Sequence, residues 1–524
     1  MTHEHSRRRF IKTVLLASGA IFTSWNDLIA GGSLPPHGAS HEIGTDVESL
    51  QFKTAHAILR DRKRKVTFPK PNETVDCVVI GGGISGLAAA WRLMKEGKSF
   101  VVLDGEPKMG GAARYGEWKG KRYPMGAGYF VTWDGIYKQI YEDIGIKPVS
   151  TGEDALWYGT GDMHVDWWNN ENLSSLPISA NDKEAFKKYR DVLLKLDPLP
   201  DYPLVNASKE IIAQYDTISA KDYLSQFGSR ELLNWMNEYS YSSCGTSIDQ
   251  VNAYCFLNFY QAEFGKEFDL PRFTFPGGVV GTIEKLAQRA GEQNIRLNSL
   301  VLQIKNVKGG VEVGYLDAEG VPRMIKARTA IGALQKKIVQ HMIPEMPKEQ
   351  LHALSQMRYE PYITVNLLCN GPLLPKRAFD TWFQDKDRIF TDMVDGFLST
   401  DMQAGTPDRM QGDFAYCVYC PRPENKRWFL QDERYVAEYA QKVAQAVANH
   451  VPNAMDVIEE MHVFAWGHTM VIPFVNSHST LFPAISQPCG NIFFANTDND
   501  ISPSAESGII NGHWAAEQAI RKMA

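Results

Sequence analysis

The stretch Val75-Asp-Cys-Val-Val-Ile80-Gly81-Gly82-Gly83-Ile84-Ser85-Gly86 decides the fold of this 524-residue chain. Its first six residues form a short apolar, β-branched run, which is typical of a buried parallel strand. Strong helix formers follow over 87–96 and end at Gly97, and 99–104 has the composition of a second strand. The sequence therefore predicts a complete β-turn-α-β unit.

The glycines of this stretch have the spacing of a dinucleotide-binding turn. Gly81 permits the tight turn, Gly83 lets the backbone approach a pyrophosphate, and Gly86 lets the helix pack on the strand. The N–H groups at the start of the helix, including that of Ser85, would donate hydrogen bonds to the phosphates. Asp104, at the end of the second strand, would accept hydrogen bonds from ribose hydroxyls. We therefore predict a dinucleotide cofactor.

Two segments that follow Asp104 indicate which dinucleotide is bound. They read Gly110-Gly111-Ala-Ala-Arg114 and Pro124-Met-Gly126-Ala127-Gly128-Tyr129. Both resemble signatures of the flavin-containing amine oxidase superfamily, although that family has an arginine where this chain has Ala112. The resemblance implies that Gly110, Gly111 and Arg114 contact FAD, and that Gly126 and Ala127 pass beside the isoalloxazine ring.

Four later segments resemble the same superfamily and are widely separated along the chain. They are Phe275–Leu286, Asn294–Ile304, Gly490–Asp498 and Ser504–Ala516. The resemblance implies that Val301 meets the adenine through its backbone. It also implies that Asp498 binds a ribityl hydroxyl or lies near the pyrophosphate, and that Glu506 belongs to the closing flavin-binding helix. Pro488-Cys489-Gly490 is not the S-G-G-C motif of covalent attachment, so we expect non-covalent FAD.

The same resemblance predicts the division of the chain into domains. The fold class is α/β, a two-domain flavoprotein whose Rossmann-like FAD-binding domain is interleaved with an α+β substrate domain. The FAD-binding domain would comprise 73–135, 272–336 and 480–524, and the substrate domain 136–271 and 337–479. Within the substrate domain, the patterns predict helices at Lys183–Leu196, Ala220–Glu238 and Tyr435–Val451, and a strand at Tyr362–Leu368.

The chemistry implied by the resemblance is the transfer of a hydride from a substrate C–N bond to flavin N5, which leaves an imine that water hydrolyses. Many amine oxidases have a lysine near N5, where this chain has Thr364. That difference suits a dehydrogenase that passes electrons to another acceptor, but oxygen, a quinone and a cytochrome all stay open as the acceptor. Met357–Asn366 and Trp466-Gly467-His468 bear a softer resemblance to bacterial spermidine dehydrogenase, so an amine or polyamine is the expected substrate.

Several side chains have both a functional and a structural interpretation. His468 would accept a proton or orient the substrate, or it is a hydrogen-bonded structural histidine. Trp466 would wall an amine site through cation–π contact, or it packs in the core. Asp249 or Glu263 would pair with the distal ammonium of a polyamine, or they are surface acids. The same ambiguity between cavity wall and core packing holds for Tyr129, Tyr239, Tyr241 and Tyr359.

Two other functions use the same FAD framework. One is the desaturation of C–C bonds, as in phytoene desaturase and protoporphyrinogen oxidase, and the other is a non-catalytic flavoprotein. The composition argues against one further function, nucleic-acid binding. The chain has 55 Lys and Arg against 61 Asp and Glu, a net charge of -6, which offers no basic face for nucleic acid. Seven cysteines without a ligand cluster indicate neither a disulfide framework nor a metal site, and the oligomeric state is left open.

The N-terminal residues predict export. Ser6-Arg7-Arg8-Arg9-Phe10-Ile11-Lys12 resembles the S-R-R-x-F-L-K motif of twin-arginine signals, ahead of a short uncharged run. We assign 1–30 as the signal peptide and 31–72 as a linker. The resemblance implies passage through the twin-arginine translocase to the bacterial periplasm.

Overall fold

The computed structural model describes residues 43–45, 66–132, 135–147, 149–159, 161–196, 199, 207–264 and 272–524. The predicted signal peptide, 1–30, and most of the predicted linker, 31–72, lie outside the described residues. Among the helices that are described, none combines the length and the apolar character that a membrane span requires.

A parallel sheet forms around the glycine-rich stretch. The predicted strands are confirmed as β2 and β3, which pair in parallel with Cys77 opposite Phe100, and β13 pairs with β2 in parallel on the other side. The order is β10-β3-β2-β13-β12-β11, and β19 pairs with β13. Its described strands are β2 (Glu73–Ile80), β3 (Phe100–Leu103), β10 (Ile295–Arg296), β11 (Leu300–Val307), β12 (Gly310–Leu316), β13 (Pro322–Gly332) and β19 (Ile492–Phe494).

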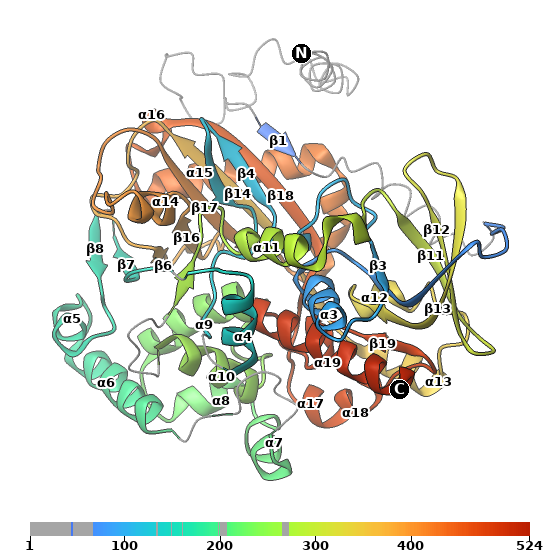
Figure 1. Cartoon of the computed structure of the whole chain (residues 1–524). Helices are drawn as coiled ribbons and strands as arrows, with labels where there is room; N and C mark the ends of the chain where they lie inside the picture. Colours follow the sequence, from blue (N-terminus) through green and yellow to red (C-terminus); the bar gives the residue numbers. More distant parts are fainter. Residues whose placement is uncertain are drawn as a thin grey trace. The chain divides into compact units, whose positions relative to one another are not determined.

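Two helices pack together beside this sheet. Helix α3 (Ile84–Lys95) follows the glycine turn, as predicted, and α19 (Ala505–Met523) contains the last residues of the chain. They run side by side in Figure 1 and contact each other along their length. A Cβ atom placed on Gly512 would lie 2.1 Å from the backbone oxygen of Ser85, so only glycine permits this approach. Ala89, Ala515 and Ala516 continue the small-residue contact.

A second sheet is mixed and has eight described strands, in the order β1-β18-β14-β17-β16-β15-β7-β8. The predicted strand at Tyr362–Leu368 is confirmed within β14. Because side chains alternate along a strand, Ile363 and Val365 face helix α15 (Glu433–His450), whereas Tyr362 and Thr364 face the opposite side. The strands are β1 (Ile43–Thr45), β7 (Ala155–Tyr158), β8 (Asp162–Val165), β14 (Tyr359–Cys369), β15 (Asp380–Trp382), β16 (Asp392–Asp395), β17 (Phe414–Pro421) and β18 (Ile458–Val471).

Helices from the first half of the chain pack into one aromatic-rich core. The pattern over Ala220–Glu238 predicted continuous helix, but the structure divides it into α8 and α9 at Gly228. The reason is local, since Gly228 has a φ of 68° and Ser229 caps α9 by accepting a hydrogen bond from Leu232 N. These helices are α4 (Gly135–Asp143), α5 (Asn170–Ser175), α6 (Ala180–Lys195), α7 (Lys209–Tyr215), α8 (Ala220–Ser225), α9 (Arg230–Cys244) and α10 (Ala253–Phe264).

The remaining elements connect or cover the two sheets. Helix α11 packs on α3, and α15, which confirms the helix predicted at Tyr435–Val451, covers the second sheet. The helices are α11 (Val280–Ala290), α12 (Lys336–Val339), α13 (Lys348–Gln356), α14 (Leu398–Gln403), α15 (Glu433–His450), α16 (Ala454–Val457), α17 (Ser477–Thr480) and α18 (Phe482–Ile485). Two small strand pairs are β4 (Tyr115–Trp118) with β5 (Lys121–Pro124), and β6 (Val149–Ser150) with β9 (Phe273–Thr274). Short 3-10 turns are η2 (Gly111–Ala113), η4 (Glu292–Asn294), η5 (Glu424–Gln431) and η6 (Thr497–Asn499).

The first sheet draws its strands from 73–103, 295–332 and 492–494, and the second from residues on either side of these. This interleaving is compatible with the predicted domain boundaries, which stay a prediction.

Candidate active site

A cavity of about 370 Å³ is lined by residues from the turn after β2, from the face of the second sheet that carries Tyr362 and Thr364, and from helices α9, α10 and α19. Most of the residues predicted from the sequence line it. These are Gly81, Gly83, Ser85, Asp104, Gly110, Gly111, Arg114, Gly126, Ala127, Thr364, Trp466 and Glu506. Four predicted residues do not line it, namely Gly86, Val301, His468 and Asp498.

One end of the cavity is a backbone cradle, which we call the glycine cradle and define as Gly81–Gly83 together with Gly110 and Gly111. Gly81 has a φ of 111°, and a Cβ atom there would lie 2.7 Å from the backbone oxygen of Ala333. Gly110 N donates to Gly82 O over 3.1 Å, so the two segments are joined. The start of α3 also lines the cavity, and its N-cap residue Gly83 makes no side-chain cap hydrogen bond, which fits a pyrophosphate.

Gly86 supports this cradle from behind. A Cβ atom on Gly86 would lie 1.9 Å from the backbone oxygen of Gly81, so the first turn of α3 packs directly on the glycine turn. This is the helix–strand contact that the sequence predicted for Gly86, although the residue does not reach the cavity.

Asp104 lies at the carboxyl end of β3, next to the cradle. Its Oδ2 accepts a hydrogen bond from Gly82 N over 2.6 Å, and its Oδ1 accepts one from Glu106 N over 2.8 Å. Burial raises the pKa of Asp104, against these two hydrogen bonds. Arg114 forms an ion pair with Glu106 over 3.1 Å, and both line the cavity. A carboxylate at this strand end is placed to meet a ribose beside the phosphates.

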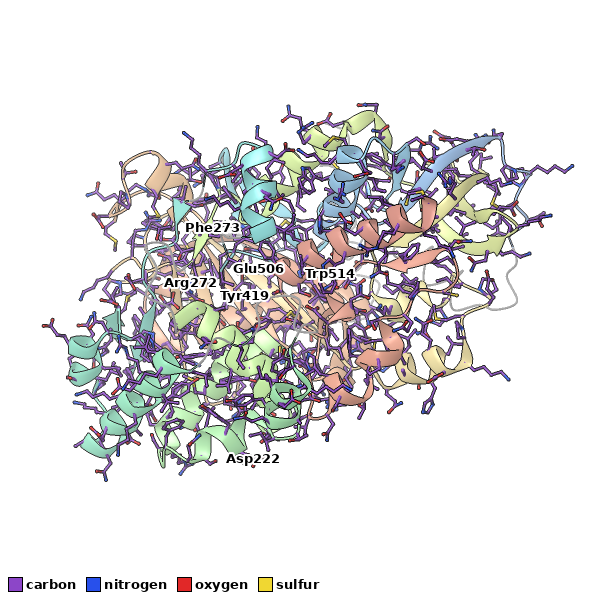
Figure 2. The ribbon with its side chains drawn as sticks, turned by 60° about the horizontal axis from the view of Figure 1, so that its bottom comes forward. Asp222, Arg272, Phe273, Tyr419, Glu506 and Trp514 are labelled. Atoms are coloured by element: carbon purple, nitrogen blue, oxygen red, sulfur yellow. The ribbon has the colours of Figure 1, made fainter. Side chains whose placement is uncertain are left out.

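The start of α19 forms another wall of the cavity. Ser504 caps the helix by accepting a hydrogen bond from Ser507 N, and Glu506 Oε1 accepts one from Val131 N over 2.6 Å. Ser504 and Glu506 line the cavity, and Figure 2 labels Glu506 in the interior. An N-terminal turn of a long helix again presents N–H donors toward a polar or anionic group.

Asp498 and Val301 lie behind the cavity wall. Asp498 Oδ2 accepts hydrogen bonds from Lys336 N over 2.6 Å and from the Tyr359 hydroxyl over 2.5 Å, so it joins the two sheets. Asn496 and Thr497 line the cavity in its place. Val301 is 2% exposed in the core of the first sheet. Roles of Asp498 and Val301 in cofactor binding stay predictions.

Three side chains of the second sheet hold the segment that follows β5. The Thr364 hydroxyl and the Trp466 indole N–H both donate to Met125 O, over 2.8 and 3.1 Å. The Tyr419 hydroxyl donates to Gly126 O over 2.8 Å. Thr364 and Trp466 therefore hold the backbone at Met125 as well as lining the cavity, and the cation–π role of Trp466 stays a prediction.

His468 is carried away from the cavity by a bulge in β18. Tyr362 pairs with Trp466 and Glu360 with Met470, so three residues of β18 stand opposite Pro361 alone. Proline has no N–H to donate, which explains why the ladder is interrupted here. The imidazole of His468 packs edge-on against Tyr359, at 6.1 Å between ring centroids. Its catalytic role stays a prediction, but the bulge favours the structural interpretation.

Glu263 lines the cavity and belongs to a buried cluster of charged side chains, of which sequence reasoning identified only Glu263. We call Glu263, Asp154, Arg272, Asp380 and Asp392 the acidic end. Glu263 Oε1 accepts hydrogen bonds from the hydroxyls of Tyr129 and Tyr239, over 3.2 and 3.1 Å. Its Oε2 is buried and has no hydrogen-bond partner among the described residues. Asp249, the other acid considered, is exposed on the surface.

Arg272 does not neutralise Glu263 by direct contact, because its guanidinium forms a buried ion pair with Asp154. The same guanidinium lies 5.2 Å from the ring centroid of Tyr129 and 5.5 Å from that of Phe379. Burial raises the pKa of Glu263 to about 7, and the positive charge of Arg272 only partly opposes this. The carboxyl group of Glu263 therefore titrates near neutral pH at the cavity wall.

Sequence reasoning missed several cavity residues. Ser242, Ser243, Phe259, Tyr362 and Tyr419 line the cavity but were not singled out. Tyr362 lies within Met357–Asn366, and the first three lie within Tyr241–Asp249 and Phe256–Tyr260, which also bear a softer resemblance to spermidine dehydrogenase. The period-two alternation of β14 and β17 was the available signal, because Tyr362, Thr364 and Tyr419 share one face. That alternation does not reveal which face meets the cofactor.

Comparison with known proteins agrees with this geometry. A family described as flavin containing amine oxidoreductase matches residues 84–520. The chain is 26% identical over 313 residues to an L-amino-acid oxidase of Demansia vestigiata, covering 56% of this chain and 57% of that protein. It is 24% identical over 287 residues to a pseudooxynicotine dehydrogenase of Pseudomonas sp, covering 52% and 54%. The chain thus spans little more than half the length of these curated relatives.

The fold is also similar to that of a solved structure. The solved structure of wild-type putrescine oxidase bound to putrescine superimposes with a TM-score of 0.65 at 16% identity, covering 86% of this chain and 99% of that one. At this identity the likeness shows a shared fold, and the predicted α/β class is confirmed. The family match covers most of the chain, so this protein belongs to the flavin containing amine oxidoreductase family.

Proposed function

We propose that this protein is an FAD-dependent oxidoreductase that removes hydride from the C–N bond of an amine carrying a second positive charge, such as a diamine or polyamine. The observation that carries the proposal is the unpartnered carboxyl oxygen of Glu263 at the wall of the cavity. Family membership implies a flavin, and bound flavin supplies the electron acceptor for the carbon next to nitrogen.

The residues present fit FAD rather than a shorter flavin. The glycine cradle and the start of α3 suit a pyrophosphate, and Asp104 suits a second ribose beyond it. The start of α19 and Gly126 lie along the same cavity, toward the face that carries Thr364 and Trp466. None of the cysteines, which all lie in the described residues, lines the cavity, and this supports non-covalent binding.

Glu263 favours a cationic substrate. It is 8% exposed, and a buried carboxylate with an unsatisfied oxygen is costly unless a partner enters with the ligand. Tyr129 and Tyr239 hold Oε1, which leaves Oε2 for an ammonium group. The carboxylate of an amino-acid substrate would instead be repelled at this end. This polar end also disfavours the C–C desaturase alternative, which would need an apolar tunnel.

Electron transfer and export complete the proposal. Thr364 stands where many amine oxidases have lysine, so a quinone or a cytochrome is proposed as the acceptor in preference to oxygen. The resemblance of Ser6–Lys12 to a twin-arginine signal supports export of the folded protein to the periplasm. Reoxidation of reduced protein by oxygen, a soluble quinone or cytochrome c, followed by absorbance, would separate the acceptors.

The decisive experiment is an anaerobic stopped-flow measurement of flavin bleaching. For each substrate we compare the rate constant of flavin reduction divided by KM. We expect this ratio to be higher for 1,4-diaminobutane than for 1-aminobutane or L-leucine. Glu263→Gln should reduce this quantity for the diamine by about 10- to 150-fold, because a hydrogen bond to a charged group contributes about 1.5–3 kcal/mol. The same substitution should leave the monoamine nearly unchanged.

Glu238→Gln provides the matched control. Glu238 is also a buried glutamate, on α9, but it does not line the cavity. Equal losses for the diamine and the monoamine in Glu263→Gln would contradict the role of Glu263. Bleaching by polyenes or porphyrinogens alone would replace the proposal with the C–C desaturase, and no bleaching in any panel would favour a non-catalytic flavoprotein.

A further inference from the structure

The loop that leads into α19 contains a strained residue beside the cavity. We call Asp500–Ser504 the pre-helix loop. Within it, Ile501 has a φ of 52°, a left-handed conformation that β-branched residues rarely adopt. Thr497 and Pro503, on either side of Ile501 along the chain, line the cavity. Such a conformation persists only where the surrounding contacts hold it in place, so the contacts of this loop matter for the cavity wall.

The side chain of Asp500 ties the pre-helix loop to α19. Asp500 Oδ1 accepts hydrogen bonds from the Ser507 hydroxyl and, over 3.1 Å, from Asn511 Nδ2. Ser507 N in turn donates to Oγ of Ser504, the N-cap residue that lines the cavity, over 3.0 Å. Asp500 is therefore bonded to the first two turns of the helix whose start forms the cavity wall.

His478 holds the same loop from the other side. Its Nε2 lies 2.9 Å from Asp500 O, and because a carbonyl oxygen only accepts, Nε2 carries a proton and donates it. Its Nδ1 lies 3.1 Å from Asn252 Nδ2 and 3.4 Å from Asp216 Oδ1. A neutral imidazole accepts from Asn252 at this nitrogen, and a protonated one donates to Asp216. Nε2 donates to the loop in both states.

A buried network fixes the position of His478. Asp216 Oδ1 accepts from Asn252 Nδ2 over 2.8 Å and from His478 N over 3.3 Å. Asp216 Oδ2 accepts from the backbone N–H and the hydroxyl of Ser479, over 2.8 and 2.6 Å. The ring of Tyr254 packs edge-on against the imidazole, at 5.2 Å between centroids. Because Asp216 follows α7 and Asn252 precedes α10, the network joins these two helices to the pre-helix loop.

Other contacts hold α19 slightly further along the helix. Glu506 Oε1 accepts from Val131 N over 2.6 Å, and the Tyr137 hydroxyl donates to Glu506 O over 3.2 Å. These contacts fix Glu506, whereas His478 and Asp500 act on the loop ahead of it.

We propose that His478 and Asp500 are positioning residues for the flavin, which hold the pre-helix loop in its strained conformation and so direct the N–H groups at the start of α19 into the cavity. The positive end of a helix dipole stabilises negative charge. A flavin bound in the cavity gains negative charge on reduction, so this arrangement favours reduced over oxidised flavin. His478 does not line the cavity and acts through Asp500. The inference needs bound flavin, which family membership implies, but not the proposed amine substrate.

The test is the midpoint potential of the flavin in the holoenzyme, measured by reduction with dithionite in the presence of a reference dye. His478→Leu should shift the equilibrium toward oxidised flavin by about 2- to 30-fold, the range found for charges at helix N-termini. For two electrons this corresponds to a potential lower by about 10–45 mV. His478→Gln keeps an N–H donor toward Asp500 O and should recover most of the wild-type potential.

His513→Leu is the matched control. His513 lies on α19 itself but does not line the cavity, and its ring packs 6.3 Å from that of Trp91. It should leave the potential unchanged. Ser507→Ala removes one hydrogen bond to Asp500 and should also lower the potential, so it decides the question if His478→Leu does not fold with flavin.

Three results would overturn the positioning role. They are a wild-type potential in His478→Leu or in Ser507→Ala, an equal decrease in His513→Leu, and no recovery in His478→Gln. Failure of every amine to reduce the flavin would instead reject the proposed function, and would leave the measured potentials and their interpretation in place.

Discussion

The glycine cradle and Glu263 line one cavity, but the cradle and the acidic end to which Glu263 belongs are built in opposite ways. The cradle consists of backbone from two short segments, where a Cβ atom at Gly81 or Gly86 would overlap the chain. The acidic end consists of side chains from α10, β15, β16 and the residues before β7 and β9. Backbone recognition leaves a local signature because only glycine permits it, whereas the side chains of the acidic end meet through long-range packing.

We expect the largest effect from breaking the buried ion pair of the acidic end, which joins Arg272 to Asp154. Arg272→Met should destabilise the protein by about 3–5 kcal/mol, because it leaves Asp154 buried without its partner. Denaturant unfolding followed by fluorescence measures this change. The double variant Arg272→Met/Asp154→Asn should recover part of the loss. A double variant no more stable than Arg272→Met would show that the charge itself is unimportant here.

A smaller loss is expected from filling the contact beneath the cradle. Gly86→Ala would place a Cβ atom 1.9 Å from Gly81 O, and overpacking of this kind costs about 1–3 kcal/mol. We expect a lower flavin-to-protein absorbance ratio as well as lower stability. Gly97→Asn is the control, since it ends the same helix with a φ of 66° and has no atom within 4 Å of an added Cβ. Full flavin content in Gly86→Ala would show that flavin binding does not require glycine at this position.

The smallest effect is a pH dependence confined to the acidic end. The pKa of Glu263 is raised to about 7, so the carboxylate needed for cation binding forms as the pH rises through neutrality. Below pH 7, KM for 1,4-diaminobutane should increase by about tenfold per pH unit, or about 1.4 kcal/mol, relative to KM for 1-aminobutane. Taking the ratio cancels the ionisation that both amines share. Glu263→Gln should give a flat ratio, and a sloping one would assign the titration to another group.

The parts of the fold and site that were predictable follow from this contrast. The strand-turn-helix at 75–96, the helix in α15 and the strand in β14 were predictable because their periodicity or their glycines are local. The break at Gly228 was not, because one residue with positive φ decided it. The position of His468 was not, because a bulge opposite Pro361 moves the residue out of register with Trp466.

By itself, the sequence determined the α/β class, the cofactor-binding turn and the family, since each rests on residues whose backbone geometry excludes substitutes. The tertiary structure alone decided which side chains line the cavity. It brought Glu263 against Tyr129 and Tyr239, although more than 130 residues separate Tyr129 from Glu263. The physical reason is that the pKa and the partners of a carboxyl group depend on its burial and its neighbours, which only the folded chain supplies.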